Sequence, residues 1–154
     1  MKLKLFLFVL SIFTFSFSFG QGSEKMLEFN GSNSYVNCGS VNLNGTALTM
    51  MGWVKVTQFN MNSASPAAQI TSLWGAESGN PTLMRLGDGI PLDRDKVQFV
   101  ISTSAGPSKL NGTRVLNANE WYHIAGVYDG ATMKIYINGK LDATKTQTGA
   151  ISNS

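Results

Sequence analysis

The sequence is poor in the residues that build disulfide frameworks and catalytic sites. It contains one cysteine, Cys38, and one histidine, His123, among 154 residues. A single cysteine excludes an internal disulfide, so the fold depends on its hydrophobic core, and we expect Cys38 to be a buried small apolar residue. A single histidine excludes metal sites that need two histidines. We expect His123 to be a packed, hydrogen-bonded structural residue of a strand.

The N-terminus has the composition of a signal peptide. Two lysines in the first four residues precede an apolar run over residues 5–19, and the small residues Ser18 and Gly20 match a cleavage site. The run is shorter than the roughly 20 apolar residues of a membrane-spanning helix, and no cationic stop follows it. We therefore predict that residues 1–20 are a signal peptide, with a retained membrane anchor as the alternative.

The remaining domain, residues 21–154, has nearly balanced charge. The full chain has a formal net charge of +3, and two of its twelve cations belong to the predicted signal peptide. The mature domain therefore carries a net charge of about +1, which gives no indication of nucleic-acid or anionic-lipid binding. We expect a protein that is secreted or displayed at the cell surface, with no membrane insertion after cleavage.

The mature chain alternates short β-branched and aromatic runs with Gly, Asn, Ser and Pro at intervals of eight to twelve residues. This spacing predicts an all-β sandwich or barrel, and no apolar stripe of helical period accompanies it. A helix fits only residues 61–69, where Pro66 disfavours it. The expected strands are Lys25–Phe29, Tyr35–Cys38, Ala47–Val56, Gln69–Trp74, Thr82–Leu86, Lys96–Thr103, Thr113–Leu116, Trp121–Tyr128, Thr132–Asn138 and Lys140–Thr144.

The clearest strand signal lies near the C-terminus. Apolar residues alternate with polar or amphipathic ones from Met133 to Ile137, which assigns one face to the core and leaves Tyr136 on the other face. Asn138–Gly139 then supplies the two positive-φ residues of a tight type I′ turn. Asp129–Gly130 supplies a similar turn upstream. The sequence therefore predicts a three-stranded meander.

Three segments carry strand motifs in a fixed order. They are Leu27–Val36 (LEFNGSNSYV), Leu48–Lys55 (LTMMGWVK) and Trp121–Gly130 (WYHIAGVYDG), the last followed at hairpin distance by Ile135–Gly139 (IYING). Together they resemble the laminin-G-like branch of the concanavalin A-like lectin/glucanase superfamily over nearly all of the mature chain. The resemblance implies an antiparallel jelly-roll β-sandwich. It also implies a sugar-binding or adhesion module of a secreted or cell-surface protein.

One part of the family pattern has no counterpart in the chain. Domains of this family continue past the hairpin with a closing strand that pairs beside the first strand, and no such segment precedes Ser154. We therefore expect a jelly-roll that is missing its closing strand, in a chain truncated at its C-terminus. The strand Leu27–Phe29 would then keep an unpaired edge.

The carboxylates do not have the arrangement of a glycosidase. Glucanases of this fold place paired carboxylates on one strand, spaced Glu-x-Asp-x-x-Glu, so that both project into one cleft. The four glutamates of the mature chain are isolated, at Glu24, Glu28, Glu77 and Glu120. The Gly-x-Ser-x-Gly pattern of a serine nucleophile is absent as well. We therefore expect no enzymatic activity.

Aromatic residues are the candidates for a ligand site, because an exposed indole can stack on a sugar ring while a buried indole fills a core. Trp53 and Trp121 lie inside strand motifs, and we expect both in the core. Trp74 ends a strand beside a Gly- and Asn-rich loop, so we take Trp74 and the loop residue Asn80 as ligand-binding candidates. Tyr136 is a further candidate, with an ordinary solvent-facing tyrosine as the alternative.

Three aspartates lie in one loop-like stretch, at Asp88, Asp93 and Asp95. Calcium binds six or more oxygen ligands, and these carboxylates are the weak candidates for such a site. A solvated turn is the alternative, because the stretch lacks a defined calcium-loop spacing. We expect no required cofactor, with calcium as the one candidate ion.

The expected function is binding outside the cell. We expect carbohydrate or a glycosylated surface as the partner, recognised by rim loops and one sheet face. The alternative is a structural or adhesion domain that contacts extracellular protein within a larger surface protein. An exposed aromatic beside a groove would favour sugar, and a flat apolar patch without aromatics would favour protein.

Overall fold

The computed structural model describes residues 25–39, 41–59, 71–76, 81–87, 93 and 95–152. They fall into two units, of which the first ends at Gly39 and the second begins at Ser40. Within the described ranges, no helix is long and apolar enough to cross a membrane. The predicted signal peptide, the segment 61–69, Asn80 and Asp88 lie outside the described residues.

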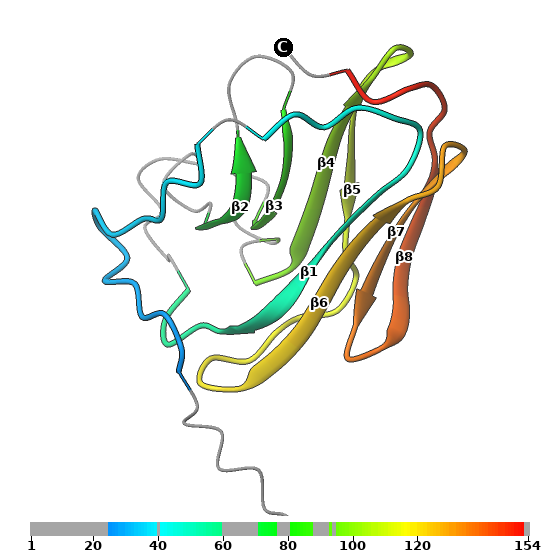
Figure 1. Cartoon of the computed structure of the whole chain (residues 1–154). Coiled ribbons are helices and arrows are strands. Elements are labelled where there is room, and N and C mark those ends of the chain that lie inside the picture. The colour runs from blue at the N-terminus through cyan, green and yellow to red at the C-terminus, as the bar shows by residue number, and fades with distance from the viewer. Residues whose placement is uncertain are drawn as a thin grey trace, which may run out of the picture. The chain divides into compact units, whose positions relative to one another are not determined.

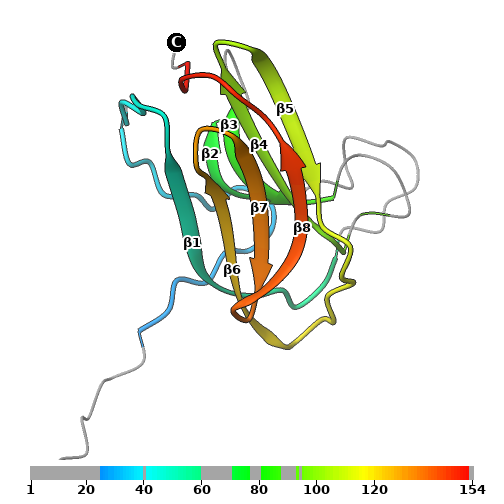
Figure 2. The same cartoon turned by 90° about the vertical axis from the view of Figure 1, so that its right-hand side faces the viewer.

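The second unit contains two antiparallel four-stranded sheets. One sheet has the strand order β1-β6-β7-β8 and the other has the order β2-β3-β4-β5 (Figure 1). The strands are β1 Leu48–Lys55, β2 Thr71–Ala76, β3 Thr82–Leu86, β4 Val97–Thr103, β5 Gly106–Asn111, β6 Trp121–Tyr128, β7 Thr132–Ile137 and β8 Lys140–Thr146. In Figure 2, β1, β6, β7 and β8 lie in front of the other sheet. The predicted all-β antiparallel sandwich is confirmed.

The core fills the space between the two sheets. In β7 every second residue is buried and the residues between them are half-buried, as expected for a strand with one face on a core. Burying one large apolar side chain contributes about 1.5–3 kcal/mol, so this shared core is the main stabilising element. Its buried members are Met84, Leu86, Val97, Phe99, Ile101, Leu110, Leu116, Tyr122, Ile124, Tyr128, Met133, Ile135, Ile137 and Ile151.

Two glycines allow aromatic rings of one sheet to approach the backbone of the other. A Cβ atom at Gly126 of β6 would lie 2.9 Å from the ring of Phe99, and one at Gly52 of β1 would lie 2.6 Å from the ring of Trp74. Phe99 is fully buried, whereas Trp74 is half-buried. Glycine is therefore required on the inner side of both strands for these rings to fit.

The predicted meander of β6, β7 and β8 is confirmed by the strand pairing. Asn138 and Gly139 have φ values of 51° and 75°, which the tight β7–β8 turn requires. At the β6–β7 turn, the Asp129 carboxylate accepts hydrogen bonds from the backbone N–H groups of Ala131 and Thr132. Both turns are therefore set by residues recognisable in the sequence.

The strand prediction is wrong between β4 and β6. The structure has β5 at Gly106–Asn111 and no strand over 113–116. β5 begins with Gly-Pro, a weak strand signal that an edge strand tolerates. The backbone N–H groups of Thr113 and Arg114 donate instead to the carboxylate of Asp142, which satisfies them outside a ladder.

The first unit is irregular over its described residues. Both strands expected between Lys25 and Cys38 are wrong, since this segment joins no ladder with another described segment. The side-chain oxygen of Asn30 instead accepts hydrogen bonds from the backbone N–H groups of the three residues from Ser32 to Ser34, which forms a local turn. Cys38 is exposed in this irregular segment, so its expected burial is also wrong.

Candidate functional site

The outer side of the sheet β1-β6-β7-β8 carries a cluster of aromatic and apolar side chains. Every second residue of a strand points away from the core, and on this sheet several of these residues are large. Trp53 is 65% exposed and Trp121 is 45% exposed. We call this surface the aromatic face, and its members are Met51, Trp53, Trp121, His123, Tyr136 and Leu141.

The exposure of Trp53 and Trp121 corrects the expectation that both indoles lie in the core. In β1, Met50 and Val54 pack against the core, so Trp53, which is adjacent to Val54 along the strand, points to the opposite side. In β6, Tyr122 is buried and its neighbour Trp121 is exposed for the same reason. The side that a residue faces follows from the alternation within its strand. Membership of a strand motif does not determine that side.

Trp53 and His123 face each other across β1 and β6. Their ring centroids are 5.4 Å apart with an interplanar angle of 65°, which is an edge-to-face contact. The backbone of His123 donates a hydrogen bond to the Asn138 side-chain oxygen and accepts one from the Asn138 N–H, at 2.9 and 2.8 Å. His123 is therefore a packed residue with a hydrogen-bonded backbone, as predicted, and it supports one edge of the Trp53 indole.

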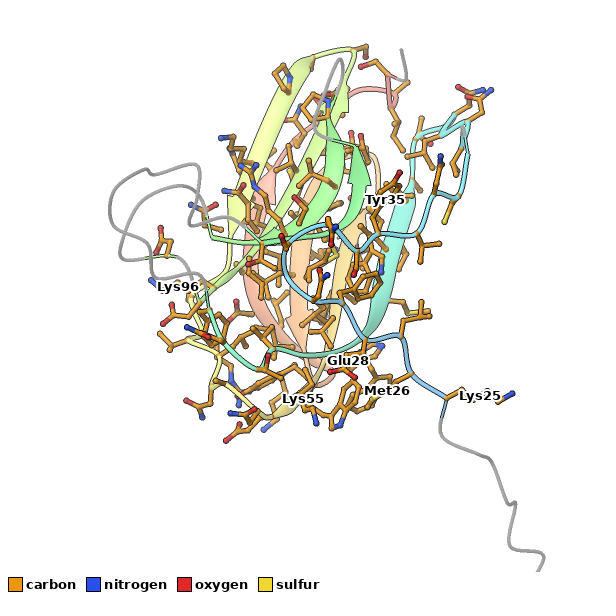
Figure 3. All side chains as sticks on the ribbon, turned by 90° about the vertical axis from the view of Figure 1, so that its left-hand side faces the viewer. Lys25, Met26, Glu28, Tyr35, Lys55 and Lys96 are labelled. Atoms are coloured by element: carbon orange, nitrogen blue, oxygen red, sulfur yellow. The ribbon has the colours of Figure 1, made fainter. Side chains whose placement is uncertain are left out.

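Lys55 and Trp121 form the adjacent pair on the same two strands. They are directly opposite in the register, and the Lys55 Nζ atom lies 5.6 Å from the centroid of the Trp121 ring. This is a cation–π contact, worth about 0.5–1 kcal/mol at an exposed site. Figure 3 labels Lys55 near the end of β1. One indole of the aromatic face therefore has an ammonium group above its ring.

A second row of side chains extends the aromatic face across all four strands. Met51, Ala125, Tyr136 and Leu141 are register partners from β1 to β8. Met51 and Leu141 are exposed, and Tyr136 is half-buried. Tyr136 therefore lies on the outer side of its strand as predicted, beside the row that contains Trp53.

Two carboxylates near the aromatic face are hydrogen bonded within the protein. Asp129 forms an ion pair with Lys134 at 2.8 Å, and this contact, with the two turn N–H groups, lowers the pKa of Asp129 to about 2. Glu120 accepts a hydrogen bond of 2.6 Å from the Tyr122 hydroxyl, which lowers the pKa of Glu120, and the Asn117 amide contributes further. Both carboxylates are therefore ionised and engaged at neutral pH.

Trp74, a predicted ligand-binding candidate, is half-buried. A β-bulge between Ser72 and Trp74 shifts the register, and both Leu73 and Trp74 pack against the core. The Trp74 ring approaches Gly52 of the opposite sheet, as described above. No local pattern indicates the bulge, because it depends on the pairing of β2 with β3.

The outer side of the sheet β2-β3-β4-β5 has a different character, which sequence reasoning missed. Arg85 Nε donates to Gln98 Oε1 and Gln98 Nε2 donates to Asn111 Oδ1, both at 2.6 Å. Arg85 and Gln98 are buried, with exposed fractions of 7% and 1%. A hollow of about 180 Å³ on this side is lined by Pro81, Leu83, Arg85, Val100 and Lys109. Polar residues inside otherwise apolar strands were the signal that could have located this row.

The candidate calcium ligands are only partly described. Asp93 forms an ion pair with Lys96 at 2.8 Å, and its hydrogen bond raises the pKa of Lys96. Asp95 has one buried carboxylate oxygen without a hydrogen-bond partner. Among the described residues, no three acidic, histidine or cysteine side chains gather as a metal would require. Asp88 lies outside the described residues, so the calcium site stays a prediction.

The antiparallel sandwich and its open aromatic face define a lectin-like β-sandwich domain. The family model of the concanavalin A-like lectin/glucanases superfamily, of the laminin G type, matches residues 30–154, and the chain belongs to this family. The crystal structure of a putative carbohydrate binding protein from Bacteroides ovatus is similar, with a TM-score of 0.56 and 24% identity. The similarity covers 73% of this chain but only 30% of that one. A comparison with curated proteins finds no match.

Proposed function

We propose that this chain is an exported, non-catalytic module that binds carbohydrate on its aromatic face. The observation that carries the proposal is the exposure of two indoles, Trp53 and Trp121, on neighbouring strands of one sheet. Aromatic rings offer large apolar surfaces with few rotatable bonds, which suits them to the apolar faces of sugar rings. The lectin/glucanase family and the structural neighbour described as a putative carbohydrate binding protein support this class of ligand.

The contacts beneath the two indoles also support the proposal. Trp53 is held at one edge by His123, and the backbone of His123 is tied to the β7–β8 turn through Asn138. A side chain that is already ordered loses little entropy when a ligand binds, so such residues make effective anchors. Export is proposed from the composition of residues 1–20.

A glycan-array screen with the exported chain tests the proposed function. We expect binding to at least one polysaccharide, a loss of about tenfold or more in affinity for Trp53→Ala, and no effect of a chelator. The matched control is Val115→Ala, which removes an exposed apolar side chain outside the aromatic face. Absence of binding to every glycan, with binding to an extracellular protein through Trp53, would replace carbohydrate by protein as the partner.

A further inference from the structure

The ammonium group above Trp121 restricts the chemistry of a ligand on the aromatic face. The Lys55 Nζ atom lies 5.6 Å from the centroid of the Trp121 ring, on the surface where a sugar would stack. A neutral sugar has to displace this ammonium group to reach that side of the indole. A sugar with an anionic substituent can instead keep the ammonium in place and pair with it.

Lys55 has no counter-ion within the described part of the protein. The carboxylate of Asp129 lies beyond the other end of β6 and is paired with Lys134, at 2.8 Å. The contact of Lys55 with Trp121 is weak at an exposed position, so it leaves the ammonium able to bind an anion. The aromatic face therefore has a positive charge among its rings that the described protein does not neutralise.

The carboxylate of Glu120, the residue before Trp121, is exposed and is engaged within the protein. Glu120 is hydrogen bonded to the hydroxyl of Tyr122, whose ring is buried. Arg114 lies over the same Tyr122 ring at 5.5 Å, and its charge contributes to the lowered pKa of Glu120. Glu120 and Arg114 therefore balance each other around Tyr122, and Lys55 is left for a ligand.

We infer that the ligand is an acidic polysaccharide whose sugar rings stack on Trp53 and Trp121 while an anionic group pairs with Lys55. This inference rests on the proposed function, since it assigns a ligand class to the same face. A hydrogen bond between an ammonium and a carboxylate or sulfate is stronger than one between neutral groups, so Lys55 selects for charge while the indoles provide contact area. Lys55 is a specificity-determining residue in this arrangement.

The test compares three polymers by affinity electrophoresis and calorimetry with the exported chain. The probes are polygalacturonate, which carries carboxylates, dextran sulfate, which carries sulfates, and neutral galactan. We expect an acidic polymer to bind more tightly than galactan, with affinity falling as salt rises because the contact is ionic. The preferred acidic probe identifies which anionic group the site takes.

The decisive variant is Lys55→Gln, which keeps most of the side-chain stem and removes the charge. We expect it to weaken binding of the acidic polymer by about tenfold, the effect of one hydrogen bond to a charged group. Lys109→Gln on β5 of the opposite sheet is the control, because it changes the net charge equally and leaves the aromatic face intact. Thermal unfolding of each variant establishes that it is folded.

The possible results separate this inference from the proposed function. Equal loss in Lys55→Gln and Lys109→Gln, or tighter binding of galactan than of either acidic polymer, would overturn the inference and leave carbohydrate binding standing. Failure of all three polymers and of the glycan array would overturn both. A loss specific to Lys55→Gln, together with a loss for Trp53→Ala, supports both.

Discussion

The outer sides of the two sheets follow the same strand alternation but present opposite surfaces. On the sheet β1-β6-β7-β8, Trp53 and Trp121 are exposed. On the sheet β2-β3-β4-β5, Arg85 and Gln98 are buried and joined in a row of hydrogen bonds. Large apolar groups left in solvent indicate recognition, while buried polar groups with satisfied hydrogen bonds indicate structural support. The difference supports the proposal that one sheet binds the ligand while the other stabilises the fold.

The largest effect is expected from breaking the hydrogen-bonded row. Gln98→Ala removes the acceptor of Arg85 Nε and the donor to Asn111, and leaves polar groups without these partners in a buried place. We expect the free energy of unfolding to fall by about 3 kcal/mol, measured by urea denaturation. Gln58→Ala, at an exposed position, is the control and should change it little. If Gln98→Ala were as stable as Gln58→Ala, the hydrogen-bonded row would not be a structural support of the sheet β2-β3-β4-β5.

The next effect concerns the inner side of the sheet that carries the aromatic face. Gly126→Ala pushes a methyl group against the ring of Phe99, which is fully buried and has no space to move. We expect a loss of about 2 kcal/mol in the free energy of unfolding, because overpacking a dense core is destabilising. Gly52→Ala is the matched comparison and should cost less, since the half-buried Trp74 can shift. A larger loss of unfolding free energy for Gly52→Ala than for Gly126→Ala would show that the Trp74 ring is held more tightly than the Phe99 ring.

A smaller effect is expected from acid, through Asp129 at the β6–β7 turn. The pKa of Asp129 is lowered from 3.8 to about 2, so its contacts contribute stability above pH 3.8 that is lost as pH falls towards 2. The row of Arg85, Gln98 and Asn111 contains no carboxylate. We expect Asp129→Asn to reduce the change in urea midpoint between pH 5 and about pH 2 relative to the unmodified protein. If the urea midpoints of Asp129→Asn and of the unmodified protein changed equally with pH, the contacts of Asp129 would not be a source of the acid sensitivity.

The smallest effect on stability is expected on the aromatic face itself. Trp53→Ala removes a side chain that is mostly in solvent, so we expect the free energy of unfolding to change by less than about 0.5 kcal/mol. The same variant is expected to lose carbohydrate affinity. Measuring both quantities on one preparation separates binding from folding. A large loss of stability would instead place Trp53 among the structural residues.

Local patterns in the sequence predicted the fold where each strand carried its own signal. Alternation from Met133 to Ile137 and the Asn138–Gly139 turn located the β7–β8 hairpin correctly, because both features are local. β5 was missed, since its ladder with β4 is a tertiary contact and its sequence opens with Gly106-Pro107. The segment 113–116 was taken for a strand, although its N–H groups bond to the distant side chain of Asp142.

The candidate site was also predicted only in part, because much of it depends on strand pairing. Tyr136 was placed on the correct side of its strand by alternation. Trp74 was taken as a ligand-binding candidate, but it is half-buried and packs against the core beside a bulge that depends on strand pairing. Trp53 and Trp121 were expected in the core because they lie in strand motifs. A strand motif does not indicate which of its side chains face the core, so the expectation was wrong. The pairing of Lys55 with Trp121 depends on the register of β1 with β6, which no single segment encodes.

The unequal burial of the three tryptophans provides a spectroscopic probe without any added label. Trp53 and Trp121 emit from water-exposed positions, while Trp74 lies against the core. A ligand that covers the first two should shift their emission to shorter wavelength and shield them from a soluble quencher, whereas Trp74 should respond only when the sandwich opens. Replacing Trp74 by Phe leaves a chain whose fluorescence reports occupancy alone.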